Sequence, residues 1–328
     1  MTQRRPRIAL ILLLCLFTAV PVPAQRNAPI KEQNIRAELA FLASDAMQGR
    51  GSGTIYERIA AEYIGSQFRQ FGLEPGGDAD SAGNKSYVQR VPLNSGVVPG
   101  GEPRNTWNAI GVLRGTGPGE AIMLSAHLDH LGVDESLTGD KIFNGADDDA
   151  SGCVAVLELA RVLAAGKRPR RTIYFVCFGS EESGGDGSRH FIANAPVPLT
   201  QLVADLTFEM LGRPDAKVPA GTLWLTGFER STLGPELARQ GAALVADPHP
   251  EQGFFQRSDN YPLALRGVIA HTVSSFGLHP DYHRPSDEIS RIDFPFMTRS
   301  LNSLVKPVQW LANSTFRPTW LPGQAPTR

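Results

Sequence analysis

The chain has 328 residues, of which 41% are hydrophobic and 20% are charged. This composition is ordinary for a globular protein with a sizeable core, and it excludes disordered, coiled-coil and collagen-like chains. The 32 basic residues balance 33 acidic ones, so no basic excess exists to drive binding to nucleic acid or to an anionic membrane surface.

The first residues carry the pattern of a secretory signal peptide. Three arginines precede an apolar run at 8–20, and small residues around Ala24 offer a cleavage site. The run is shorter than the about 20 residues that a membrane helix needs, so a retained anchor is the less favoured alternative. We expect residues 1–24 to be removed and the mature protein to be periplasmic or extracellular, without stable membrane association.

The mature chain alternates between helix and strand patterns. In chain order, the apolar periodicity predicts helices at 35–42 and 56–71, strands at 87–93, 107–113 and 121–126, a helix at 151–165, strands at 172–178, 202–210, 222–226 and 268–273, and a helix at 301–311. This alternation predicts one α/β domain over residues 25–315, with a largely parallel, twisted central mixed sheet flanked by helices. A Pro-rich tail follows at 316–328.

Only two cysteines remain after the signal peptide, Cys153 and Cys177, and both lie in apolar runs. An exported protein with so few cysteines is not a disulfide scaffold. We therefore expect two buried free thiols and a fold that depends on its hydrophobic core.

Histidines and acidic residues collect where the predicted strands end. They are His127, Asp129 and His130 after 121–126, Glu181 and Glu182 after 172–178, Glu209 within 202–210, His279, Asp281 and His283 after 268–273, and Asp147, Asp148 and Asp149 before the helix at 151–165. In open α/β sheets, ligands bind at the carboxyl ends of the strands. Histidines together with several carboxylates suit divalent metals, zinc above all.

Each of these pieces also has a purely structural explanation. A lone histidine in a loop is usually a satisfied polar residue, and one acid of the triplet could cap the following helix. Glu209 is harder to explain in this way, because it follows Leu206 and Phe208 in an apolar strand and a buried carboxylate needs a partner charge or a metal. The joint occurrence at several strand ends favours a metal site.

The ordered motifs resemble the M28 family of co-catalytic zinc aminopeptidases. The matching stretches are His127-x-Asp129, Gly145-Ala146-x-Asp148-x-Ala150-Ser151-Gly152, Glu181-Glu182 and Tyr282-His283-x-x-x-Asp287, together with Asp45-x-Met47-x-Gly49-Arg50 and Arg257-Ser258-Asp259. Their order and spacing extend over most of the mature chain, which makes the match specific although any single motif would be weak.

The resemblance implies two zinc ions per chain and a set of ligands for them. Asp148 would bridge the two ions. His127 and Glu209 would complete the protein ligands of one ion, and Glu182 and His283 would complete those of the other.

The resemblance also implies two residues that act without binding metal. Glu181 would be the general base. Asp129 would hydrogen-bond His127 and fix its tautomer. Two metals about 3.5–4 Å apart can share a water and lower its pKa toward neutrality, so the implied reaction is attack by a metal-bridged hydroxide on the first peptide bond of a substrate with a free N-terminus.

Two positions depart from the family pattern. Glu209 stands where the family often has Asp, and the extra methylene still permits coordination. Asn260 follows Arg257-Ser258-Asp259 where the family frequently has His. Since Asn260 can hydrogen-bond but cannot ionise near neutral pH, we interpret it as a change on the substrate side.

Several other functions remain as alternatives. A carboxypeptidase of the same fold would need a basic group for the terminal carboxylate, and Arg257 is available. A glutaminyl cyclase would use one zinc ion and fewer ligands. A serine hydrolase could use Ser258, Asp259 and His271, but no Gly-x-Ser-x-Gly elbow is present. A binding protein that had lost catalysis should lack a ligand or the base, and none is missing.

Overall fold

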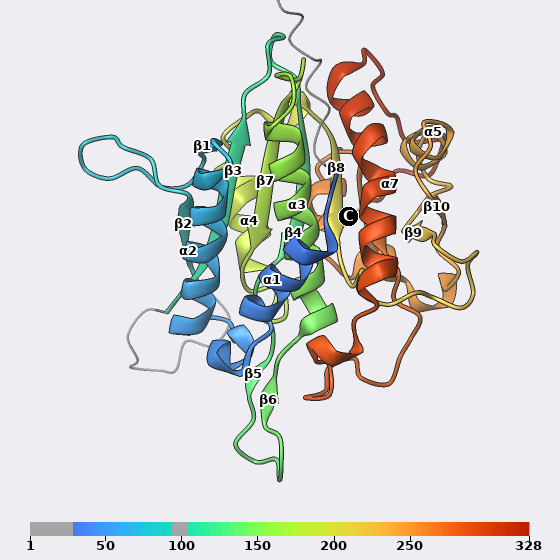
Figure 1. Ribbon diagram of the computed structural model, residues 1–328. Helices are drawn as coiled ribbons and strands as arrows, with labels where there is room; N and C mark the ends of the chain where they lie inside the picture. The colour runs from blue at the N-terminus through green and yellow to red at the C-terminus, as the bar shows by residue number, and fades with distance from the viewer. Residues whose placement is uncertain (1–28, 94–103, 328) are drawn as a thin grey trace, which may run out of the picture.

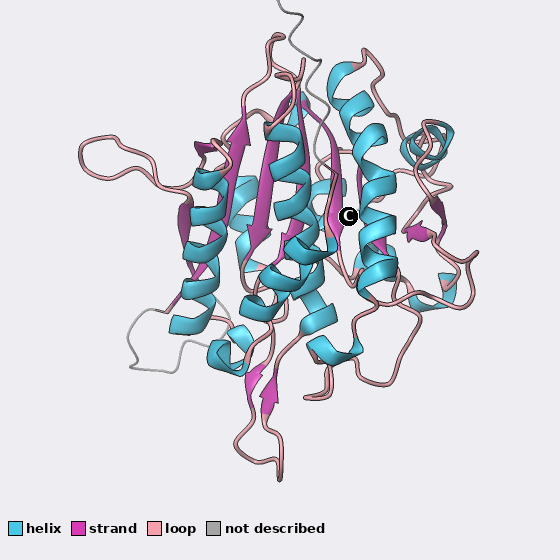
Figure 2. Ribbon diagram, viewed as in Figure 1, coloured by secondary structure: helices cyan, strands magenta, loops and turns pink. Residues whose placement is uncertain are grey.

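The computed structural model describes residues 29–93 and 104–327, so the predicted signal peptide lies outside the described residues. Within this part of the chain, a large mixed sheet is covered by helices on both faces (Figures 1 and 2). None of the helices in these two ranges is both long enough and apolar enough to span a membrane. The architecture confirms the predicted α/β class.

The strands of the large sheet among the described residues are β1 (Glu74–Pro75), β2 (Val88–Pro92), β3 (Asn105–Leu113), β4 (Ala121–His127), β7 (Thr172–Phe178), β8 (Leu202–Phe208), β9 (Leu223–Leu225), β10 (Leu244–Ala246) and β11 (Ala270–Ser274). Their order is β1-β3-β7-β4-β8-β11-β9-β10, with β2 also paired to β3. The central strands β7, β4, β8 and β11 are mutually parallel, whereas β3 and β9 run antiparallel to their neighbours in the centre.

The longer helices follow the predicted periodicity. They are α1 (Glu32–Leu42), α2 (Ile55–Gln70), α3 (Gly152–Ala164) and α7 (Phe294–Asn313), with the shorter α4 (Asp186–Ala193), α5 (Leu233–Arg239) and α6 (Asn260–Ala264). The Thr54 hydroxyl accepts a hydrogen bond from the Glu57 N–H at the start of α2, and the Asp293 carboxylate accepts one from Phe296 at the start of α7. These N-caps satisfy backbone donors that have no partner within the helix.

The core lies on both faces of the sheet, as β7 shows. Ile173 and Phe175 pack on the side covered by α1, α2, α3 and α7, while Tyr174 and Val176 point to the opposite side. There they pack near Phe191 of α4, which lies behind the sheet in Figure 1. Because alternate side chains of a strand face opposite sides, a strand buried on both faces is apolar throughout, as the continuous run at 172–178 predicted.

Some elements have no counterpart in the prediction. They are the small helices α4, α5 and α6, the edge strands β1 and β10, and the hairpin of β5 (Gly132–Val133) and β6 (Ile142–Phe143), which projects from the lower end of the molecule in Figure 1. All are too short for a period to stand out. Cys153 and Cys177 are buried and free, as predicted.

Candidate metal centre

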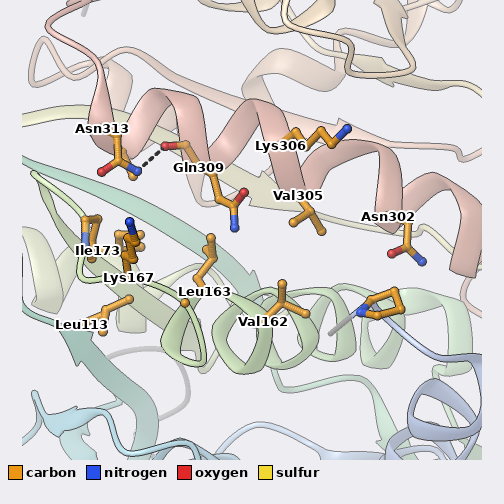
Figure 3. A pocket seen from close by; sticks show the side chains of 14 residues that line it. Leu113, Val162, Leu163, Lys167, Ile173, Asn302, Val305, Lys306, Gln309 and Asn313 are labelled. Atoms are coloured by element: carbon orange, nitrogen blue, oxygen red, sulfur yellow. Dashed lines mark hydrogen bonds between the residues drawn. The ribbon is translucent and has the colours of Figure 1, made fainter. Parts of the chain in front are cut away.

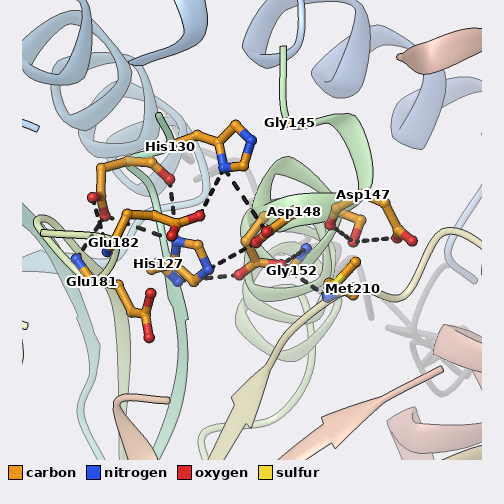
Figure 4. Close-up of polar contacts among 12 residues, drawn as sticks. His127, His130, Gly145, Asp147, Asp148, Gly152, Glu181, Glu182 and Met210 are labelled. Atoms are coloured by element: carbon orange, nitrogen blue, oxygen red, sulfur yellow. Dashed lines mark hydrogen bonds and ion pairs between the residues drawn. The ribbon is translucent and has the colours of Figure 1, made fainter. Parts of the chain in front are cut away.

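The parallel strands deliver polar side chains to one edge of the sheet (Figure 4). His127 is the last residue of β4, Glu181 and Glu182 follow β7, and Glu209 comes directly after β8. His283 lies in the segment that follows β11. Because these strands run in the same direction, their carboxyl ends meet, and residues far apart in the sequence come together.

Two groups of candidate ligand atoms share Asp148. His127, Asp148 and Glu209 form one group, and His130, Asp148 and Glu182 form the other, with the ligand atoms of each group within 4.8 Å of one another. His283 joins the second group, since its Nε2 lies 3.2 Å from Asp148 Oδ2 and 3.1 Å from Glu182 Oε1. The five ligands predicted from the sequence therefore gather in one place, together with His130, to which the sequence assigned no role.

Buried atoms at the centre of this cluster lack partners. His127 Nε2, His283 Nε2 and Asp148 Oδ2 have no hydrogen-bond partner among the described residues, although a buried unpaired polar group costs about 1–3 kcal/mol. His127 Nε2 lies 3.2 Å from Asp148 Oδ1. Imidazole nitrogens and carboxylate oxygens are ordinary zinc ligands, so this donor set fits divalent cations bound between its members.

The three consecutive acids, Asp147, Asp148 and Asp149, make different contacts. Asp149 accepts hydrogen bonds from the backbone N–H groups of His127, Gly152 and Met210, and so joins the ends of β4, α3 and β8. Asp147 accepts one from the N–H of Gly212. The carboxylate of Asp148, which lies between these two acids, faces the imidazoles of His127, His130 and His283.

The turn that carries Asp148 is held by hydrogen bonds to Asp287, a residue far away in the sequence. The Asp287 carboxylate accepts hydrogen bonds from the backbone N–H groups of Asp147 and Asp148 at 3.0–3.1 Å. Asp147 in turn contacts His279 Nε2 at 3.0 Å. The segment that contributes His283 and the turn that contributes Asp148 are thus fastened to each other, which accounts for the spacing Tyr282-His283-x-x-x-Asp287.

Asp129 makes a different contact from the one predicted. The His127 Nδ1–H donates to the main-chain oxygen of Asp129 at 3.1 Å, and the Asp129 carboxylate is 3.8 Å away, beyond hydrogen-bond distance. β4 ends at His127, so the alternation of an extended strand does not continue to residue 129. The carboxylate instead accepts from the N–H groups of Glu181 and Glu182 and from the Ser52 hydroxyl.

Burial and charge set the protonation of the acids. Burial raises the pKa of Glu181 well above its ordinary value, and burial raises that of Glu209 to about 7. Burial would also raise the pKa of Asp148, but the facing imidazoles of His127 and His283 hold it well below its ordinary value. A partly buried acid with a raised pKa is suited to accept a proton near neutral pH.

Strained backbone occurs where the chain turns into the cluster. Ser180, Met210 and His283 have φ values of 62°, 55° and 53°, in the left-handed region that non-glycine residues rarely adopt. Each stands next to or at a residue of the cluster. Such strain costs about 1–3 kcal/mol per residue and concentrates at functional sites.

An aromatic pocket opens beside the acids. It has a volume of about 40 Å³ and is bordered by Asp148, Glu181, Glu182, Glu209, Met210, Trp224, Thr226, Phe254, Arg257, Thr272, Ser274, Phe276 and Tyr282. The Phe254 ring stacks on Trp224 with 5.5 Å between centroids. The Arg257 guanidinium lies over Phe254 and contacts the Tyr282 hydroxyl at 3.4 Å.

The geometry corrects the interpretation of Asn260 and excludes the serine-hydrolase alternative. Asn260 is fully buried and bonds to Phe255 O and Thr272 Oγ1, so it supports the pocket wall from behind rather than facing substrate. Both ring nitrogens of His271 are engaged by Ser231 Oγ and Thr226 O at 2.8 and 2.7 Å. His271 is therefore unavailable to Ser258, and the serine-hydrolase triad does not form.

A much larger groove lies elsewhere, between α3 and α7 (Figure 3). Its volume is about 780 Å³, and its walls include Leu163, Ile173 and Val305 with Lys167 and Lys306. Among the residues that the structure describes, no histidine or carboxylate lines it. The groove therefore lacks the residue types that metal binding or acid–base chemistry requires.

The sequence is similar to known peptidases. The model of Peptidase family M28 matches residues 108–306. An aminopeptidase of Pseudomonas aeruginosa is 34% identical over 113 residues, which are 34% of this chain and 19% of that protein. The leupeptin-inactivating enzyme 1 of Streptomyces exfoliatus is 27% identical over 60% of this chain and 39% of its own length. The aligned segments thus cover less than half the length of each of these relatives.

Solved structures share the fold at low identity. BSAP, a zinc aminopeptidase from Bacillus subtilis, aligns with a TM-score of 0.65 at 18% identity, covering 87% of this chain and 96% of that chain. The glutaminyl cyclase of Porphyromonas gingivalis also aligns with a TM-score of 0.65, at 19% identity, covering 87% of this chain and all of that chain.

Proposed function

The chain belongs to peptidase family M28, and from this premise we propose that it is a zinc aminopeptidase that removes N-terminal residues from peptides. The observation that supports this most is the pair of ligand groups that meet at Asp148. Two groups with one shared carboxylate suit two zinc ions held close together.

We assign the ligands as the family resemblance implied. His127 and Glu209 would hold one ion, Glu182 and His283 would hold the other, and Asp148 would bridge both. When bound, zinc polarises a peptide carbonyl and lowers the pKa of water in the site. The protein's own contribution is to keep these side chains at the carboxyl ends of the strands, where the ties from Asp149 and Asp287 limit their movement.

Glu181 is the proposed general base. Its backbone N–H donates to the Asp129 carboxylate, and its side chain borders the aromatic pocket together with Asp148, Glu182 and Glu209. Burial raises its pKa, so it can take a proton from water and return it to the leaving amine. General acid–base catalysis of this kind contributes about 10²–10⁴-fold.

The surroundings favour a substrate with a free amino end. Glu181, which binds no zinc in this proposal, borders the pocket with its carboxylate, and a positively charged N-terminus complements it. The apolar walls formed by Trp224 and its aromatic neighbours would receive the first side chain. A peptide entering the pocket would then present its first peptide bond to the metal centre.

A substrate panel tests this proposal directly. The zinc-loaded protein should hydrolyse aminoacyl amides and should leave their N-acetylated counterparts intact, because the acetyl group removes the positive charge. Cleavage of blocked peptides from the carboxyl end would favour the carboxypeptidase alternative instead. Equal rates on free and blocked amides would contradict the aminopeptidase assignment.

Glutaminyl cyclase is a second candidate, favoured by the structural neighbour from Porphyromonas gingivalis and by the aromatic pocket. Cyclisation of an N-terminal glutamine releases ammonia without cleaving the peptide chain. A peptide that begins with glutamine separates the two activities. Ammonia release with an intact chain would identify a cyclase, and a free N-terminal amino acid would identify an aminopeptidase.

Export and the domain limits remain part of the same proposal. The signal-peptide pattern supports cleavage after Ala24, with residues 25–315 as the peptidase domain. N-terminal sequencing of the mature protein from the native cell tests this. A mature chain that begins at Met1 would contradict it.

A further inference from the structure

His130 is the one histidine of the cluster that the proposed function does not use. Its Nδ1 forms a hydrogen bond of 2.9 Å with Glu182 Oε1 and lies 3.9 Å from Asp148 Oδ2. His127 and His283 differ, because their Nε2 atoms approach carboxylates at 3.1–3.2 Å without forming hydrogen bonds among the described residues. Those two imidazoles aim between the carboxylates, as ligands of a shared ion do, whereas His130 points at Glu182 itself.

The environment of the second ring nitrogen of His130, Nε2, indicates whether this residue is a metal ligand or supports one. His130 Nε2 is buried and has no partner within the described part of the chain. A histidine that binds metal almost always donates its other N–H to an acceptor, and His127 does so through Asp129 O. Ligation through Nδ1 would leave the His130 proton on Nε2 without an acceptor, whereas a proton on Nδ1 is donated to Glu182.

We infer that His130 is a positioning residue, which donates its Nδ1–H to Glu182 and holds that carboxylate in the orientation needed to bind zinc. The inference rests on the proposed function, because it takes Glu182 as a zinc ligand. A carboxylate ligand with a fixed orientation loses less freedom when the ion binds, so removal of the donor should weaken zinc binding.

The backbone fixes the place of His130. Its N–H donates to the main-chain oxygen of Arg50 at 3.2 Å, and residue 130 pairs with Gly51 in an isolated bridge. Gly145 lies against the ring, where a Cβ would come within 2.6–2.7 Å of the imidazole carbons. Only glycine leaves room for the ring at this point, and the close packing restricts its rotation.

Arg50 connects the segment of His130 to the segment that precedes Asp148. The side chain is buried, with 1% exposed, and its guanidinium donates to the main-chain oxygens of Leu42, Leu128, Asn144 and Gly145. Leu128 stands two positions before His130, and Gly145 stands three positions before Asp148. The motif Asp45-x-Met47-x-Gly49-Arg50, which supplies no ligand, thus ties the segment that carries His130 to the segment that leads to Asp148.

Three variants test the inference, with zinc affinity measured by competition with a chelator. His130→Ala removes the donor, and zinc affinity should fall about 10–100-fold, as for other outer partners of metal ligands. His130→Asn places an amide N–H close to the position of Nδ1 and should restore affinity to within a few-fold of wild type. His190→Ala is a matched control on α4, outside the cluster, and should bind zinc as wild type does.

The visible spectrum of cobalt-substituted protein distinguishes positioning from ligation. His130→Asn should keep the wild-type spectrum, because the ligands do not change. Unchanged zinc affinity in His130→Ala overturns the inference. Loss of affinity that asparagine does not restore, together with an altered cobalt spectrum, also overturns it, since that result identifies His130 as a ligand. Wild-type protein that binds no zinc contradicts the proposed function itself, so the two failures are distinguishable.

Discussion

The aromatic pocket and the groove between α3 and α7 differ in size and in chemistry: the larger hollow has the less reactive walls. The groove, at about 780 Å³, is far larger than the pocket, at about 40 Å³. Its walls carry aliphatic side chains and lysines (Figure 3). The pocket is bordered by carboxylates, of which Figure 4 shows Asp148, Glu181 and Glu182, and by Met210, whose backbone is strained. The volume of the groove results from the packing of α3 against α7, whereas the candidate active site is identified by the side chains that border the pocket.

The largest effect on activity should come from Glu181→Gln. Glutamine cannot take a proton from water, so kcat/KM should fall by about 10²–10⁴-fold, while zinc content and Tm stay at wild-type values. The control is Glu135→Gln, the same chemical change on an exposed side chain that pairs with Lys141. Activity of Glu181→Gln within a few-fold of wild type would show that the base is another residue.

Removal of zinc should destabilise the pocket side of the molecule. Without cations, the carboxylates of Asp148, Glu181, Glu182 and Glu209 repel one another. A ligand present at about 1,000 times its Kd stabilises the folded state by about 4 kcal/mol. For a chain of this size, Tm should therefore fall by roughly 10 °C after treatment with a chelator. Calorimetry with and without zinc measures this, and identical transitions would contradict a bound metal.

Leu163→Ala should act on stability alone. Leu163 is 5% exposed and lines the groove, so its truncation should lower the free energy of unfolding by about 2 kcal/mol. Because the described walls of the groove carry no histidine or carboxylate, kcat/KM at 25 °C should remain unchanged. Denaturant unfolding and a kinetic assay on the same sample check both statements. A marked loss of activity would mean that the groove takes part in function.

Phe254→Leu should act on substrate choice and have the smallest effect. Phe254 is a wall of the pocket and stacks on Trp224, so a smaller side chain loses contact with the first residue of the substrate. We expect kcat/KM for peptides that begin with Leu or Phe to fall about tenfold, and that for Ala to change by less than about threefold. A uniform loss for all substrates would indicate a structural defect instead.

The long elements could be predicted from the sequence because their signal is local. The run at 172–178 coincides with β7, and the periodic stretch at 56–71 differs from α2 by one residue at each end. The short helix α6 and the edge strand β10 escaped prediction, since a few residues cannot establish a period. Their stability comes from packing against β11 and β9, which the local sequence does not report.

The candidate site shows the same division. His127, Asp148 and Glu209 could be anticipated because metal-binding residue types follow strands and resemble a known family. The role of Asp149 as a tie between strand ends could not, since it depends on the backbone N–H groups of residues 127 and 210 reaching the same carboxylate. The contact of Asp129 was likewise decided by where β4 ends.

By itself, the sequence determined the class of fold and which residue types stand at the ends of its strands, because periodicity and composition act over a few residues. Only the tertiary structure decided that Arg50 would support His130 and that His130 would meet Glu182, 52 positions further along the chain. Such contacts arise when separate segments are packed together. A hydrogen bond forms only when donor and acceptor are placed to within a few tenths of an ångström, and no local sequence pattern encodes that placement.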